Sequence, residues 1–318
     1  AESPFDKSHA RQKTAVRILE PLFRRYPQHP GVAHYVIHAC DNQEMAQQGL
    51  AAARAYSKIA PSAPHALHMP SHIFTRLGMW SDSITSNRAA QTAARAQGDI
   101  GEELHSMDYL VYAYLQEGRE LEAKRIIDQL KGMPSLDESV FKIAYAATAM
   151  PARYALERQR WMEAANIVPP SNGPPQAIAI GVWARAFGLA KSGHPDAALR
   201  ETERLREIER QLRGSQAEYS DYWAKQVEIQ QTEIMAWSAQ AEGKAKRAEI
   251  LLRKAADDED AMEKLPVTPG PVIPAREQLG NLLLEQRQPA LARKEFQAAL
   301  MAAPKRRGAL NGLTEADK

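Results

Sequence analysis

Apolar residues recur at helical spacing along most of the 318-residue chain. The segments with this spacing are of helical length and rich in Ala, Leu, Glu, Gln and Arg, which is typical of amphipathic helices. Alternating runs of Val, Ile and Thr, which would indicate strands, are scarce. Gly and Pro residues stand between the helical segments, where helices are expected to end. The pattern therefore predicts an all-α protein.

A helix–turn–helix unit recurs within this pattern at a period of about 34 residues, the period of tetratricopeptide repeats. The second helix of a unit carries a small residue, a large apolar residue, a small or apolar residue and a closing proline at fixed offsets. Two copies of this series are Ala15, Leu19, Leu22 and Pro27, and Ala292, Phe296, Ala299 and Pro304. The turns between paired helices are marked by Gly78, Gly118, Gly193 and Gly243, with Gln159 as a degenerate member.

The repeat predicts about seven helix pairs, stacked into a single right-handed α-solenoid over residues 1–318. We expect first helices near residues 30–43, 64–77, 104–117, 145–158, 179–192, 229–242 and 273–286. Residues 28–134 would form His-rich repeats, and residues 135–318 the C-terminal repeats. Segments 166–176 and 264–274 are too rich in Pro and Gly to be helical, so we expect loops there.

Residues 10–27 match the second helix of a unit, and no first helix precedes them. A solenoid that begins halfway through a repeat exposes an uncapped apolar face, so we expect this chain to be a fragment or to have lost an upstream part. The first residues carry no signal-peptide pattern. The sequence leaves the compartment open: a soluble protein of the cytoplasm, or one exported to the periplasm if an upstream signal was removed.

Charge and cysteine content exclude several classes of partner and site. Lys and Arg total 41 and Asp and Glu total 39, which gives no electrostatic reason to expect nucleic acid or an anionic membrane surface as a partner. No apolar stretch approaches the roughly 20 residues that span a bilayer. Cys40 is the only cysteine, so neither an internal disulfide nor a thiolate metal cluster can form within one chain.

Six of the nine histidines lie between positions 34 and 105 and follow the repeat. His34 and His38 share one helix face because they are four residues apart, and His68 and His72 repeat this spacing one period later. Aligning the third unit on its turn glycine places His105, Asp108 and Tyr112 in the slots of His65, His68 and His72. The three remaining histidines fall outside the register and are expected on the surface: His9, His29 and His194.

Paired imidazoles on adjacent helices are a metal-binding arrangement. His34, His38, His68 and His72 offer four nitrogen ligands to one ion, and Asp108 would supply a carboxylate. Asp41, one turn beyond His38, would bind directly or orient an imidazole. Such a site suits zinc, iron, copper, nickel or manganese. A single groove histidine more often packs or forms hydrogen bonds, so a polar groove that binds its ligand without a metal is the alternative.

Several strings resemble a bacterial family of tetratricopeptide-repeat proteins. They are HPGVAHYVIHACD (29–41), APHALHMPSHIFTRLGMW (63–80), ELHSMDYLVYAYLQEG (103–118), PARYALERQRW (151–161) and VTPGPVIPARE (267–277). The resemblance implies a solenoid whose first helices line a concave groove, and it brings no established activity. Seven residues match the family motif, without an assigned role: His34, His38, His65, His68, His72, His105 and Asp108.

The implied register continues the groove floor beyond the histidines. After Asp41 and Tyr112 it passes through Arg153, Trp183, Phe187, Glu233, Trp237 and Glu277. We interpret Arg153 as an ion-pair partner of Glu157 one turn on, in preference to an anchor for a substrate carboxylate or phosphate. Trp183 and Trp237 are interpreted as packing residues in preference to a stacking platform.

Three hypotheses for function follow. The first is a binding module whose groove holds a peptide, a protein or a small polar ligand, with a metal at the His/Asp cluster. The second is a metal-dependent hydrolase or oxidoreductase with Asp108 as ligand or general base, Tyr112 as proton donor and Arg153 as anchor. The third is a metal-free scaffold. Motifs of nucleophilic hydrolases and phosphate-binding loops are absent from the sequence.

Overall fold

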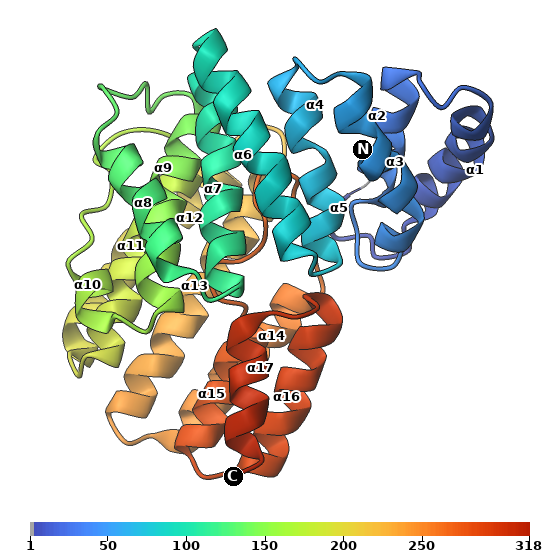
Figure 1. Ribbon diagram of the computed structural model, residues 1–318. Coiled ribbons are helices and arrows are strands. Elements are labelled where there is room, and N and C mark those ends of the chain that lie inside the picture. The colour runs from blue at the N-terminus through green and yellow to red at the C-terminus, as the bar shows by residue number, and fades with distance from the viewer. Residues whose placement is uncertain (1–2) are drawn as a thin grey trace. The chain divides into compact units, whose positions relative to one another are not determined.

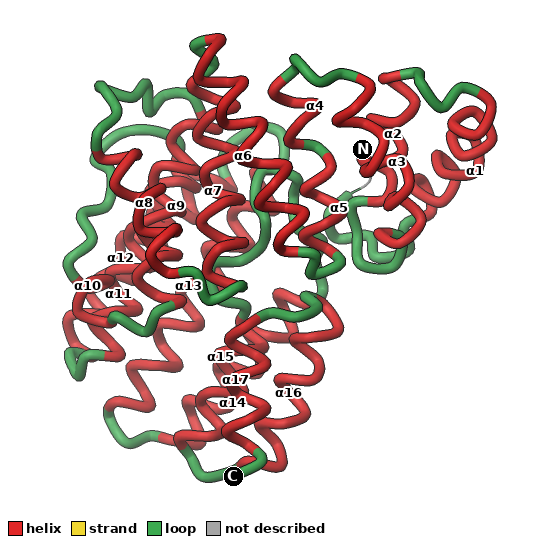
Figure 2. Tube along the Cα trace, viewed as in Figure 1, coloured by secondary structure: helices red, strands yellow, loops and turns green. Residues whose placement is uncertain are grey.

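The computed structural model describes residues 3–318, and in this range the chain forms helices and no β-strand (Figures 1 and 2). The prediction of an all-α protein is therefore confirmed. The chain divides into two compact units. Unit 1 comprises Ala1–Lys131, Glu263–Pro269 and Met301–Arg307, and unit 2 comprises Gly132–Met262, Gly270–Leu300 and Gly308–Lys318.

Unit 1 is built from eight helices, each packed against its neighbour in sequence or the next but one. They are α1 (Ala10–Arg25), α2 (Pro30–Cys40), α3 (Ala46–Ile59), α4 (Pro64–His68), α5 (Pro70–Arg76), α6 (Trp80–Gln97), α7 (Ile100–Gln116) and α8 (Glu120–Lys131). The apolar faces of the first five enclose one core, in which Ile37, Cys40 and Ile73 are fully buried. Figure 1 shows this succession from blue to green.

The helix expected over 64–77 is interrupted. Pro70 lacks a backbone N–H and its ring crowds the preceding turn, so α4 ends at His68 and α5 begins at Pro70. The chain bends little at this point, because Met69 between the two helices keeps a helical conformation (φ −51°, ψ −37°). His68 and His72 therefore remain neighbours across the break.

Unit 2 contains the two longest of the described helices. Its helices are α9 (Phe141–Glu157), α10 (Trp161–Ala165), α11 (Pro175–Lys191), α12 (Pro195–Arg213), α13 (Ser220–Ala241), α14 (Ala245–Asp260), α15 (Ala275–Glu285), α16 (Pro289–Ala302, whose last two residues belong to unit 1) and α17 (Arg307–Ala316). Helix α13 begins at Ser220 rather than near 229, because no Gly or Pro interrupts residues 220–229.

The turn residues expected between paired helices adopt left-handed backbone conformations. Gly78, Gly118, Gly193 and Gly243 have φ between 64° and 82°. Such angles are accessible to glycine without strain and allow a helix to end and the chain to reverse. Gln159 has φ 55° at the equivalent place, so the degenerate joint has the same geometry in spite of its side chain.

Proline and glycine fix the ends of several helices and two long loops. Proline occupies the first turn of six helices, where its missing N–H costs nothing: α2, α4, α5, α11, α12 and α16. Residues 166–174 and 261–274 are non-helical, as their composition indicated. Pro175 and Gln176, expected in the first loop, instead begin α11. Among the helices of residues 3–318, none is long and apolar enough to cross a bilayer.

Candidate metal centre

The six clustered histidines form two groups of three within unit 1. His34 and His38 from α2 and His65 from α4 form one group, called here the exposed triad. His68 from α4, His72 from α5 and His105 from α7 form the buried triad. In each triad, one ring nitrogen per residue lies within 4.8 Å of the other two. This grouping by three differs from the expected set of four ligands drawn from both helix pairs.

The buried triad is shielded from solvent. His68, His72 and His105 are 0%, 2% and 7% exposed. The Nε2 atoms of His68 and His72 are 3.0 Å apart, and the ring of His105 lies 4.4 Å from that of His68 between centroids. Two imidazole nitrogens bound tetrahedrally to one zinc ion would be roughly 3.3 Å apart, given Zn–N bonds of 2.0–2.1 Å. The spacing is therefore close to that of a ligand pair.

The tautomer of His68 is set by an asparagine. Asn87 on α6 directs its Nδ2 group to the backbone oxygen of Ser83 at 2.8 Å, which leaves its Oδ1 facing His68 Nδ1 at 2.7 Å. Because Ser83 O can only accept, the amide orientation is fixed by this bond, and Asn87 Oδ1 must accept a hydrogen bond from the imidazole. His68 therefore carries its proton on Nδ1.

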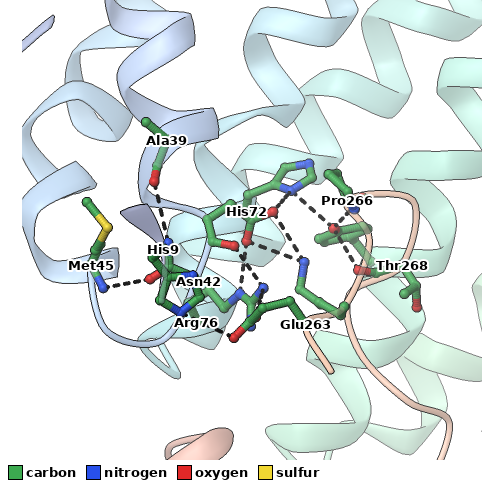
Figure 3. Close-up of polar contacts among 12 residues, drawn as sticks. His9, Ala39, Asn42, Met45, His72, Arg76, Glu263, Pro266 and Thr268 are labelled. Atoms are coloured by element: carbon green, nitrogen blue, oxygen red, sulfur yellow. Dashed lines mark hydrogen bonds and ion pairs between the residues drawn. The ribbon is translucent and has the colours of Figure 1, made fainter. Parts of the chain in front are cut away.

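The tautomer of His72 is set by a carboxylate. His72 Nδ1 lies 3.0 Å from Asp41 Oδ2, an acceptor, so Nδ1 carries the proton of this ring as well (Figure 3). Tyr109 supports the same assignment. Its hydroxyl contacts two carbonyl oxygens, those of Pro266 and Thr268, each at 3.2 Å, so it donates to one of them and faces His72 Nδ1 as an acceptor at 3.4 Å.

These two assignments place unprotonated nitrogens face to face. With both Nδ1 atoms protonated, the Nε2 lone pairs of His68 and His72 point at each other across 3.0 Å. Two buried lone pairs at this distance repel each other unless a cation lies between them. Burial lowers the pKa of both imidazoles, so a proton is disfavoured in that position. A metal ion would satisfy both nitrogens.

Asp41 is held in place by two cationic side chains. Arg76 Nε donates to Asp41 Oδ1 at 2.9 Å, and Lys264 Nζ lies 3.3 Å from both carboxylate oxygens. Burial alone would raise the pKa of Asp41, but Lys264, Arg76 and His72 keep it well below its usual range. Burial lowers the pKa of Lys264 to about 8 against the attraction of Asp41. Asp41 is thus an anion, as a carboxylate that orients a ligating imidazole should be.

The segment 263–269, called here the strap, packs beside His72 of the buried triad (Figure 3). It supplies Lys264 to Asp41, the oxygen of Glu263 to Arg76 at 3.4 Å, and the two carbonyls that hold Tyr109. None of these roles was predicted. Asn87 and Lys264 lie outside the histidine register, and Tyr109 is next to a predicted slot, so the repeat pattern carries no signal for them.

The exposed triad has fewer polar partners. The Tyr56 hydroxyl lies 3.2 Å from His34 Nδ1, and Glu102 Oε1 lies 3.5 Å from His65 Nδ1, with the His65 side chain 46% exposed. Loss of hydration, together with the charges of His72 and His34, lowers the pKa of His38 to about 4. Because Tyr56 O–H both donates and accepts, it leaves the tautomer of His34 open.

Two further predicted residues of the His-rich repeats, Asp108 and Tyr112, are buried in unit 1. Asp108 on α7 is fully buried and belongs to neither triad. Tyr112 accepts a hydrogen bond from Arg306 Nη1 at 3.3 Å and packs edge-on against Trp80.

Of the three histidines outside the register, His29 and His194 are exposed as expected. The prediction for His9 is wrong: it is 4% exposed, and its Nε2 lies 3.6 Å from Glu263 Oε1, because the strap folds over it.

The predicted floor residues of unit 2 are all at most 4% exposed: Arg153, Trp183, Phe187, Glu233, Trp237 and Glu277. Arg153 donates to the carbonyls of Pro271 and Gly270 at 2.9 and 3.2 Å, so it holds a loop of its own chain. Phe187 packs against both Trp183 and Trp237 at centroid distances of 5.6 and 5.8 Å, a geometry typical of aromatic packing.

Comparison of the sequence with protein-family models finds no match, and comparison with curated proteins finds none either.

Proposed function

We propose that this protein binds a divalent transition metal ion through His68, His72 and His105. The observation that carries the proposal is the pair of Nε2 lone pairs facing each other at 3.0 Å, with both Nδ1–H groups engaged by Asn87 and Asp41. Metal-bound imidazoles typically donate their other N–H to such partners, which fixes the ring and raises its basicity. The arrangement therefore supplies three imidazole ligands and, for two of them, the group that orients the ring.

The chemistry of the donor atoms limits which metal ions the site can bind. Three neutral imidazoles without a thiolate favour zinc, copper, iron or nickel over calcium or magnesium, which prefer oxygen ligands. Burial lowers the pKa of His68 and His72, so both are neutral and ready to ligate at neutral pH. Zinc is the first ion to test, because it tolerates a three-histidine site.

A metal at the buried triad would join three helices. Its ligands come from α4, α5 and α7, which are consecutive first-helix segments of the expected repeats. Three imidazoles leave the fourth coordination position of a tetrahedral ion to water or another group. The strap beside the site and the low exposure of the ligands nevertheless support a structural role, because a substrate would have to reach the ion. We therefore favour a tetratricopeptide-type binding protein stabilised by a metal over a metalloenzyme built on the same helices.

The sequential packing of helix pairs and the recurrent left-handed turns support the tetratricopeptide part of this proposal. The resemblance to the bacterial tetratricopeptide family adds to it. The concave groove and its peptide, protein or small polar ligand belong to the proposal as well. Under it, the metal holds the His-rich helices in register while another surface recognises the partner.

Elemental analysis of protein purified without an affinity tag or chelator tests the proposal. We expect about one equivalent of a transition metal, and a lowered thermal midpoint after chelation that recovers on adding zinc. The His105→Ala variant should lose the metal, and His65→Ala, in the exposed triad, should keep it. Protein that contains no metal and takes up no zinc, copper, iron or nickel would overturn the proposal. In that case the two Nε2 atoms share a proton.

A further inference from the structure

Unit 2 contains a partly enclosed cavity that is distinct from the histidine cluster. Its volume is about 60 Å³, and it lies among helices α9, α11, α13 and α14 and residues 271–273. This space is larger than one water molecule needs, and it has room for a molecule of a few non-hydrogen atoms. A small ligand, or the head group of one, is the occupant that fits it.

Aromatic side chains form part of the cavity wall. Tyr145 and Trp223 line it with ring centroids 5.7 Å apart and planes tilted by 53°, and Trp183 lines it as well. Aromatic faces attract cations through the ring quadrupole, most strongly in the case of tryptophan. Two tryptophans and a tyrosine around one small space are thus suited to a positively charged group.

The wall carries two carboxyl groups beside the side-chain amides of three glutamines. Glu233 and Glu259 both line the cavity, and among the described residues that line it none is a Lys or an Arg. Gln230 Oε1 is buried and has no hydrogen-bond partner in the described part of the chain. An occupant that donates hydrogen bonds and carries positive charge would satisfy these groups, whereas an anion would be repelled.

The two carboxylates are positioned by neighbouring donors. Trp183 Nε1 donates to Glu233 Oε2 at 2.7 Å, and Gln278 Nε2 donates to Glu233 Oε1 at 2.6 Å. Glu259 Oε2 accepts from the backbone N–H of Ala275 at 2.8 Å, at the start of α15. Both groups are therefore fixed before a ligand arrives, which reduces the ordering cost of binding.

Like charge and burial act on this pair together. Burial and the charge of Glu259 raise the pKa of Glu233 well above its usual range, which favours the protonated form while the cavity holds no cation. A cation bound beside it would favour the ionised form. Binding should then release a proton, a signature that a neutral ligand would not produce.

We propose that this cavity binds the ammonium group of a short primary alkylamine, with Trp183, Trp223 and Tyr145 against the cation and Glu233 and Glu259 as its counter-charges. The proposal is independent of the metal site. It names a ligand class for unit 2, and it assigns Trp183 and Glu233 to one binding site rather than to packing alone.

Calorimetric titration with ethylammonium chloride tests it, with acetamide and acetate as neutral and anionic probes of similar size. We expect a Kd of about 1 mM, near the ceiling for a ligand of three heavy atoms. Acetamide should bind at least about tenfold more weakly, because it lacks the charge that the carboxylates attract. The heat measured in buffers of different ionisation enthalpy should reveal proton release with ethylammonium alone.

Two variants and a control locate the binding. Glu259→Gln keeps an acceptor for Ala275 N–H but removes the charge, so affinity for ethylammonium should fall about tenfold. Trp223→Leu removes an aromatic face from the cavity wall, so affinity for ethylammonium should fall several-fold, and by no more than about tenfold. Glu242→Gln changes the same charge on an exposed residue at the end of α13 and should change nothing.

Equal binding of acetamide and ethylammonium, or no saturable binding of either, would overturn the proposal. So would a Glu259→Gln variant that is folded by circular dichroism and binds as tightly as the parent. If that variant does not fold, the Trp223→Leu comparison decides: unchanged affinity in a folded protein rejects the site.

Discussion

The two histidine triads of unit 1 are each built on a pair of histidines four residues apart, and they differ in the groups that surround them. His34 and His38 repeat one period later as His68 and His72, and each pair gains a third imidazole. The buried triad has an amide and a carboxylate that each fix one tautomer. The exposed triad has a tyrosine hydroxyl that fixes none and a carboxylate at 3.5 Å.

This difference shows that ligand spacing alone does not make a metal site. Water competes for the nitrogens of the exposed triad and solvates any charge on them, so protonation is an alternative to metal binding there. In the buried triad, water is excluded and protonation is disfavoured, so neither reduces the repulsion between the Nε2 lone pairs. We therefore expect the tighter metal site at His68, His72 and His105, and a weak site or none at the exposed triad.

The largest expected difference between the triads is in the free energy of unfolding, after the charge of the carboxylate beside each triad is removed. Asp41→Asn leaves Arg76 and Lys264 buried without their shared anion, and we expect a loss of about 3 kcal/mol in the free energy of unfolding. Glu102→Gln, at the exposed triad, should cost about 1 kcal/mol or less. Urea denaturation of the metal-free proteins measures both. Equal losses would show that the two carboxylates contribute equally to stability, and would contradict the proposed difference between the triads.

Loss of the group that fixes the His68 tautomer should have a smaller effect, which is seen in metal affinity. Asn87→Ala removes the acceptor that holds His68 Nδ1–H, so zinc affinity should fall about 10- to 100-fold. Tyr56→Phe, which removes the partner of His34, should leave that affinity unchanged. Competition with a chromophoric zinc chelator gives both values. If the two variants behave alike, the orienting role of Asn87 is wrong.

The last expected effect is a pH dependence of the metal-free protein. Because burial lowers the pKa of His68 and His72, the unfolded chain binds protons below about pH 6.5 that the folded chain does not. Stability is thus complete above pH 6.5 and should fall as pH decreases, by at most about 1.4 kcal/mol per pH unit for each imidazole. Asp41 does not contribute in this range, since its pKa is below its usual value of 3.8.

His68→Gln should flatten this slope between pH 6.5 and 5, and His194→Gln, outside both triads, should not. Denaturation midpoints measured in steps of pH give the slopes. A slope that is the same in both variants would mean that His68 does not resist protonation, and the case for a cation other than a proton between the Nε2 atoms would weaken.

The helical pattern was sufficient to predict where most helices and turns lie. Apolar spacing gave an all-α chain, and the turn positions at Gly78, Gly118 and Gln159 have the left-handed conformation that a joint between helices requires. The break at Pro70 was not predicted, although the missing N–H and the ring of this proline explain it. The start of α13 was misplaced because no Gly or Pro marks it in the sequence.

The sequence by itself determined that the histidines share one helix face at repeat-equivalent positions, because the spacing of four residues and the repeat period are both properties of the chain. Only the tertiary structure decided which of them meet as triads and which are buried. Asn87 from α6 and Tyr109 from α7 contact the buried triad directly, and Lys264 from the strap contacts Asp41, the partner of His72. Contacts between segments far apart in the chain depend on packing, which sets burial, tautomer and charge, and these decide what an imidazole can bind.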